Sequence, residues 1–131
     1  MKRYVSSVLL FAMVLIPTIS YAKNNLITYT SNGNEFILEK KCVKSVKMED
    51  FPDSGKEYVY TTAFFNLNKE DICFKEFGVF FKNNVGHDAI IKFNGEVLAS
   101  AKIGSPLNAE EGFYQSIPDR ALANKILDAY K

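Results

Sequence analysis

Two cysteines, Cys42 and Cys73, are the only ones in this chain of 131 residues, and their bonding state limits the folds open to it. A bond between them would close a loop of about 30 residues and add roughly 3–4 kcal/mol to stability in the chain-entropy account. That is a large share of the stability of a small domain. Disulfides persist in oxidising compartments, so the question becomes where the chain resides.

The first 22 residues have the three-part order of a secretory signal. A basic start is followed by an apolar run over residues 5–16 and by Ser20-Tyr21-Ala22, a small–x–small cleavage site. The apolar run has about a dozen residues, fewer than the ~20 that span a bilayer, so cleavage is favoured over an uncleaved anchor. We expect a signal peptide over residues 1–22, one domain over residues 23–131, a periplasmic location, and no membrane span after cleavage.

This compartment favours a disulfide between Cys42 and Cys73. A reactive thiol is disfavoured because the spacing is not C-x-x-C and no histidine lies nearby in the sequence to lower a thiol pKa. A zinc site is disfavoured because two cysteines and one histidine do not complete a four-ligand shell without a carboxylate. The sequence therefore predicts a structural disulfide and neither a metal nor another cofactor.

The charge balance excludes one class of partner. Loss of the signal removes Lys2 and Arg3, which leaves 14 basic against 15 acidic residues and changes the formal charge from +1 to −1. Binding driven by phosphate contacts needs clustered excess Lys and Arg, so nucleic acid is not an expected partner. A hydrophobic content of 47% with 24% charged residues is typical of a globular domain.

Strand-like and helix-like patterns alternate along residues 23–131. Asn94-Gly95 between two apolar runs is typical of a tight hairpin, because both turn positions need positive φ. β-Branched and aromatic enrichment predicts the other strands. The expected strands cover residues 27–29, 35–43, 56–67, 88–93, 96–103 and 113–117.

Two amphipathic helices complete the predicted domain. The first begins at Asn68 as N-cap, and Gly78 within it implies tight packing against a neighbour. The second begins at Pro118 or Asp119. The sequence therefore predicts an α+β domain in two layers, with one mixed or antiparallel sheet of about four or five strands and both helices on one face. The apolar face of the first helix carries Cys73, Phe77, Phe80 and Phe81, and that of the second carries Leu122, Ala123, Ile126, Leu127 and Tyr130.

One pattern links several of these elements. A Phe-rich helix ends in Asn83-Asn84-Val85-Gly86, the hairpin turns at Asn94-Gly95, Ser105-Pro106-Leu107 follows, and a helix begins with Ala121-Leu122-Ala123. In this respect the stretch from residue 59 to 129 resembles the periplasmic head subdomain of SecD, the accessory subunit of the bacterial protein-export translocase. The resemblance implies a small sheet-and-helix module used for contacts. Because no membrane segment follows the signal, it does not imply a translocase subunit.

Candidate catalytic groups do not combine into a site. His87 is the only histidine, and Asp88 beside it in a strand points to the opposite face, so a general base would lack an orienting group. Consecutive carboxylates such as Glu110-Glu111 are typical of solvated loops. Phosphate-binding, H-E-x-x-H and G-x-S-x-G motifs are missing from the sequence. We expect a protein that is not an enzyme and has no catalytic residues.

Small exported chains of this kind are typical of inhibitors and immunity proteins. The leading hypothesis is a periplasmic module that binds another protein, a secreted effector of the type VI kind or an envelope protein. The alternative is an accessory factor of protein export or envelope maintenance that binds translocase components or extended peptides. The basic residues between Lys40 and Lys47 are interpreted as a solvated strand edge. The candidate partner-binding residues are His87, Asn108, Glu110, Glu111 and Tyr114.

Overall fold

The computed structural model describes residues 25–52 and 59–131, so the predicted signal peptide lies outside the described residues. The predicted α+β class is confirmed, and each predicted strand and helix has a counterpart. In chain order the elements are β1 (Ile27–Ser31), β2 (Asn34–Leu38), the 3-10 turn η2 (Lys40–Cys42), β3 (Val43–Pro52), β4 (Val59–Leu67), α2 (Ile72–Asn83), β5 (Asp88–Phe93), β6 (Glu96–Lys102), β7 (Phe113–Ile117) and α3 (Arg120–Ala129).

Four strands form one antiparallel sheet in the order β2-β1-β5-β6. Both of its hairpins close through two-residue turns with positive φ, at Asn32-Gly33 (50° and 81°) and at Asn94-Gly95 (54° and 81°). Turns of this kind match the twist of the flanking strands. The predicted Asn94-Gly95 hairpin is therefore confirmed.

The other three strands form a second antiparallel sheet in the order β3-β4-β7. The structure thus has two sheets where one sheet of four or five strands was expected. The difference arises after Leu38, where η2 turns the chain and the Cys42 N–H donates to the Glu39 carbonyl at 2.9 Å. Buried Leu38 and Cys42 flank the exposed Glu39-Lys40-Lys41 segment, so the expected strand over 35–43 is split between the two sheets.

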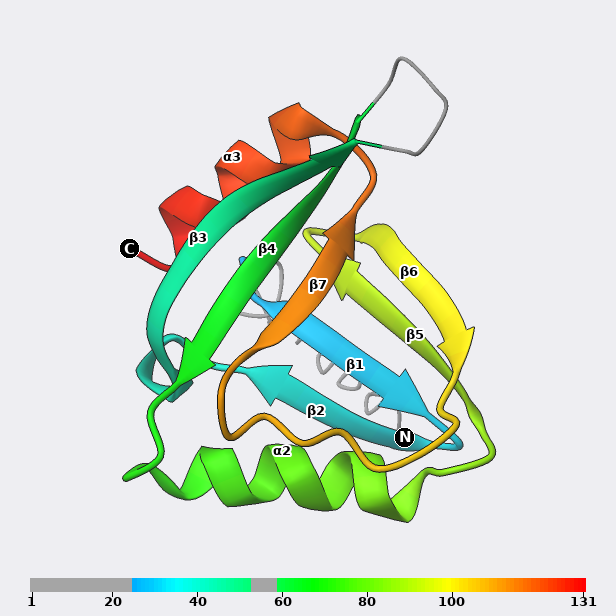
Figure 1. Cartoon of the computed structure of the whole chain (residues 1–131). Coiled ribbons are helices and arrows are strands. Elements are labelled where there is room, and N and C mark those ends of the chain that lie inside the picture. The colour runs from blue at the N-terminus through cyan, green and yellow to red at the C-terminus, as the bar shows by residue number, and fades with distance from the viewer. Residues whose placement is uncertain (1–24, 53–58) are drawn as a thin grey trace, which may run out of the picture.

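The two sheets face each other, and their strands run across one another in Figure 1, with α2 below β2 and α3 behind β3 and β4. Phe77 of α2 stacks on Phe113 of β7 with ring centroids 4.9 Å apart. Tyr130, which follows α3, packs edge-on against Phe65 of β4 at 5.5 Å. Both helices therefore contact the inner face of the three-stranded sheet. The four-stranded sheet packs against the same face.

Helix α2 differs from the expectation at two residues. Asp71, rather than Asn68, is the N-cap, and its side chain accepts a hydrogen bond from the Cys73 N–H at 3.0 Å. Asn68 instead accepts from the Glu70 N–H at 3.2 Å in the preceding turn. A Cβ on Gly78 would meet no atom within 4 Å, so the expected tight packing at this glycine was wrong.

Candidate functional site

An aromatic pair lies on the outer face of the three-stranded sheet. Phe64 of β4 and Tyr114 of β7 are cross-strand partners, and their ring centroids are 4.7 Å apart. Their sequence neighbours Phe65 and Phe113 are buried on the inner face, and alternation along each strand turns the pair outward. Tyr114 is 55% exposed, so the pair presents an aromatic surface to solvent.

Lys47 of β3 extends this pair into a row across all three strands. It is the cross-strand partner of Phe64, and its Nζ lies 5.9 Å from the centre of that ring, within the range of a cation–π contact. Glu49 borders the row, with an oxygen 3.4 Å from Lys47 Nζ and another that accepts from the Tyr114 hydroxyl at 3.4 Å. We call Lys47, Phe64 and Tyr114 the aromatic row.

The loop over residues 107–112 carries Glu110 and Glu111, and we call it the acidic loop. It ends beside the aromatic row. Asn108 accepts from the Glu110 N–H at 2.9 Å, and Glu110 forms an ion pair with Lys69 at 3.3 Å. Gly112 has φ +95°, and a Cβ there would lie 2.4 Å from Phe64 Cζ. The backbone of the loop therefore packs directly on the aromatic row, which only glycine permits at this position.

The structure brings four of the five predicted partner-binding residues toward one region. Asn108, Glu110 and Glu111 lie in the loop and Tyr114 follows it in β7. His87 is exposed at the other end of α2, where its carbonyl accepts from the Ile103 N–H at 2.9 Å. Because α2 has 12 residues and rises 1.5 Å per residue, about 18 Å in all, His87 is remote from Glu110 and its partner Lys69.

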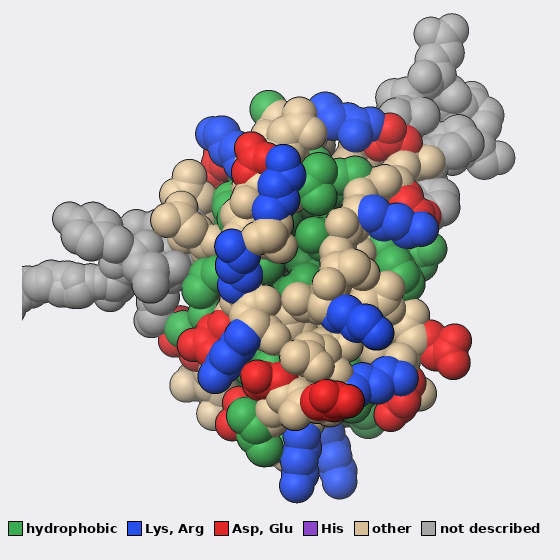
Figure 2. All heavy atoms as spheres, turned by 90° about the vertical axis from the view of Figure 1, so that its left-hand side faces the viewer, with side chains coloured by type: hydrophobic (Ala, Val, Ile, Leu, Met, Phe, Trp, Pro, Cys, Tyr) green, Lys and Arg blue, Asp and Glu red, His purple; other side chains and the backbone are tan. Residues whose placement is uncertain are grey.

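Lys and Arg side chains lie on the side of the molecule formed by β3, η2 and α3, with Asp and Glu side chains among them (Figure 2). β3 is an end strand of its sheet, and Lys44 and Lys47 are exposed along it. Lysines on an edge strand discourage pairing with another chain. This arrangement agrees with the interpretation of the basic segment as a solvated strand edge.

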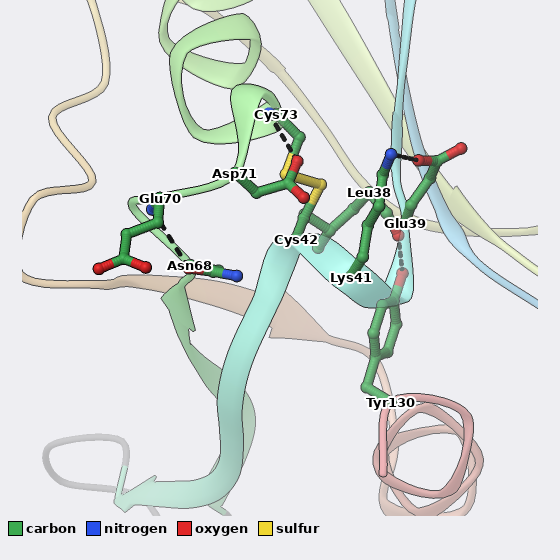
Figure 3. The surroundings of a disulfide bond; sticks show 9 residues. All are labelled: Leu38, Glu39, Lys41, Cys42, Asn68, Glu70, Asp71, Cys73 and Tyr130. Atoms are coloured by element: carbon green, nitrogen blue, oxygen red, sulfur yellow. Dashed lines mark hydrogen bonds and ion pairs between the residues drawn. A yellow bond between two sulfur atoms is a disulfide. The ribbon is translucent and has the colours of Figure 1, made fainter.

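The predicted disulfide between Cys42 and Cys73 is present in the structure and joins η2, immediately before β3, to the first turn of α2 (Figure 3). The Asp71 carboxylate lies within 4.8 Å of both sulfur atoms. Metal ligation by cysteine requires thiolates, and both sulfurs are committed to the disulfide. Cys42 is 1% and Cys73 is 4% exposed, so the bond is part of the core.

Two buried tyrosines are the described groups with strongly shifted ionisation. Burial raises the pKa of Tyr29 well above its ordinary value, and the nearby Tyr130 phenol adds to this. Burial also raises the pKa of Tyr130, and the hydrogen bond from the Ile27 N–H partly offsets it. Both hydroxyls are occupied inside the core, where Tyr29 donates to Gln115 at 3.0 Å, so they act in packing.

A second surface feature was not predicted from the sequence. A groove of about 640 Å³ runs between β2 and α2. Ile72 and Val79 of α2 line it and are 61% and 43% exposed. Their spacing of seven residues places them two helical turns apart on one stripe, beside the Phe stripe, and this spacing is the signal that could have indicated it. The lining residues are Glu35, Phe36, Ile37, Glu39, Ile72, Cys73, Lys75, Glu76, Val79 and Phe80.

No protein-family model matches the chain, and neither a curated protein nor a solved structure is significantly similar to it. Within residues 25–52 and 59–131, no helix combines the length and the apolar character needed to cross a membrane.

Proposed function

We propose that the protein is a non-enzymatic, periplasmic protein-binding module that acts as an immunity or inhibitor protein against an envelope-targeted toxin, such as a type VI secretion effector. The observation that carries the proposal is the exposed aromatic row beside the acidic loop. The signal-like N-terminus and the Cys42–Cys73 disulfide support an oxidising compartment. The resemblance to the SecD head subdomain supports a module used for contacts.

The aromatic row has the physical character of a protein-binding hot spot. Tyrosine is enriched among residues that contribute most to binding energy. Tyr114 is held from below by Phe64 and from the side by its hydroxyl contact with Glu49. A ring that is already positioned loses little conformational entropy when a partner covers it.

The acidic loop favours a partner with a basic or polar cleft. Glu110 and Glu111 are both exposed, and the Lys69 ion pair neutralises only Glu110. Complementary charge at the rim of an interface accelerates association more than it strengthens the final complex. We expect Glu111→Gln to slow association with the partner at low ionic strength and to leave dissociation nearly unchanged.

The test combines capture with protection. Immobilised protein is exposed to periplasmic extract and to any secreted toxin encoded beside it, and the captured partner is then measured against variants. Tyr114→Ala should weaken binding by about 2 kcal/mol or more, whereas Val97→Ala, which shortens an apolar residue 49% exposed on β6, should not. Absence of a stoichiometric partner together with absence of protection against the toxin would refute the proposal.

The alternative function, an accessory factor of protein export or envelope maintenance, predicts a different result. Such a factor would bind translocase components or many extended peptides weakly, and its deletion would give an export defect. An immunity protein has one tight partner, and its deletion is harmful only when the toxin is present. Deletion strains assayed with and without the toxin therefore separate the two.

A further inference from the structure

We propose that the groove between β2 and α2 binds an extended peptide segment that pairs with β2 as an added strand and carries lysine or arginine beside aliphatic residues. This inference does not depend on the aromatic row, which lies on the outer face of the other sheet. It rests on the strand edge, the apolar wall and the charges of the groove.

The edge of β2 offers backbone groups to such a strand. The two-residue turn at Asn32-Gly33 makes Ser31 and Asn34 a hydrogen-bonded pair. Hydrogen-bonded and non-hydrogen-bonded pairs alternate along an antiparallel ladder, so Ile37 is in a non-hydrogen-bonded pair with Thr28. The N–H and C=O of Ile37 therefore point away from β1, toward the groove, and among the described strands none pairs with β2 on that side.

Helix α2 supplies the apolar wall of the groove. Phe77 and Phe80 pack against Phe36 with ring centroids 5.2 Å and 6.3 Å apart, so the helix is firmly seated beside β2. Ile72 and Val79 remain exposed on the groove side of the same helix. An added strand would cover both side chains with residues from its inward-facing positions.

The charges of the groove select a basic peptide. Glu35, Glu39 and Glu76 line it against a single lysine, Lys75. Glu39 also lies 3.6 Å from Lys41, but both groups are more than half exposed, so that ion pair contributes little. The excess of carboxylates attracts lysine or arginine.

The order of residues along β2 sets the order in the ligand. Glu35, Ile37 and Glu39 alternate on one face of the strand. Side chains directly opposite each other on neighbouring strands interact most strongly, and opposite charges there are favourable. The ligand should therefore present a basic, an aliphatic and a second basic residue at alternating positions, with small aliphatic residues between them facing Ile72 and Val79.

A heptapeptide of sequence TKVIVKT, acetylated and amidated, is the probe. Its pattern is the same in both directions, so the test does not depend on strand direction. Binding of the labelled peptide is measured by fluorescence anisotropy up to about 1 mM, and amide shifts locate it at Ile37. Replacing both lysines by glutamate, or methylating alternate backbone amides, should each weaken binding by about tenfold or more.

Protein variants complete the experiment. Glu35→Lys with Glu39→Lys should weaken binding by at least about tenfold, whereas Glu96→Lys, at an exposed glutamate of β6, should not. Thermal melts confirm that the variants remain folded. Saturable binding that ignores amide methylation and charge reversal would overturn the proposal, as would no binding. Self-association that the same charge reversal abolishes would instead assign the edge to a second copy of the chain and overturn it too.

Discussion

The hydroxyl of Tyr130 bridges β1 and β2 at the end of their ladder, and its removal is a sharp test of the fold. The Ile27 N–H donates to this hydroxyl at 2.8 Å, and the hydroxyl donates to the Leu38 carbonyl at 2.6 Å. Ile27 and Leu38 are cross-strand partners in β1 and β2, and both are fully buried. The substitution Tyr130→Phe keeps the ring against Phe65 and removes only the bridge.

The expected cost follows from the two groups left behind. A buried donor or acceptor that loses its partner costs about 1–3 kcal/mol. Tyr130→Phe removes the hydroxyl partner of one donor, the Ile27 N–H, and of one acceptor, the Leu38 carbonyl. A closer approach of β1 and β2 would recover part of the loss. We therefore expect the free energy of unfolding to fall by about 3 kcal/mol, which lowers the Tm by more than about 10 °C for a domain of this size.

Urea unfolding followed by far-UV circular dichroism measures this change, with the m-value checked for constancy. Tyr114→Phe is the matched control, because its hydroxyl makes an exposed contact of 3.4 Å with Glu49, and it should change stability by less than about 0.5 kcal/mol. If Tyr130→Phe also stays within that range, the hydroxyl bridge does not stabilise the sheet as argued. Faster exchange of the Ile27 amide in the variant would locate the effect.

Three further predictions concern stability. Because burial raises the pKa of Tyr29 and Tyr130 in the folded state, the unfolded chain loses these protons first as the pH rises. The free energy of unfolding should therefore be fully retained below about pH 10 and fall above it by about 1.4 kcal/mol per pH unit for each tyrosine. Urea unfolding measured across this range should show that Tyr130→Phe halves this dependence of stability on pH. Replacing Cys42 and Cys73 together by alanine should lower the free energy of unfolding by about 3–4 kcal/mol, measured by thermal unfolding. A Tm equal to that of the unaltered protein would contradict a stabilising role of the disulfide. Gly78→Ala should raise stability by about 1 kcal/mol, since the added methyl group meets open space, and a lower Tm would reveal a packing role for the glycine.

Local patterns predicted the elements well because their causes are local. Asn94-Gly95 specifies its hairpin through the backbone angles of two residues. The split of the expected strand over 35–43 has a different origin. The chain changes sheets there because Leu38 meets Tyr130, 92 residues away, and Cys42 meets Cys73, 31 residues away. Neither contact produces a recognisable sequence pattern in the residues between Leu38 and Cys42.

The candidate surfaces follow the same division. Tyr114 was a surface candidate because it follows the acidic loop in the sequence, and the alternation of β7 between buried and exposed positions turns its side chain outward. Its pairing with Phe64 depends on the register between β4 and β7, and the groove depends on β2 being an end strand. The register of the strands sets the pairing, and their order in the sheet sets the groove. The sequence of a single strand specifies neither the register nor the order.

The segment from Leu38 to Cys42 joins the two sheets. Of the two proposed binding surfaces, the groove depends on the disulfide more than the aromatic row does. α3 holds one end through Tyr130, and α2 holds the other through Cys73 (Figure 3). Cys73 also lines the groove, whereas the aromatic row lies within one sheet. Replacing Cys42 and Cys73 together by alanine should therefore weaken binding of the basic heptapeptide while partner binding through Tyr114 persists, provided that circular dichroism shows the double variant still folded. Equal loss of heptapeptide binding and partner binding would mean that the disulfide stabilises the whole domain rather than the position of α2 beside β2.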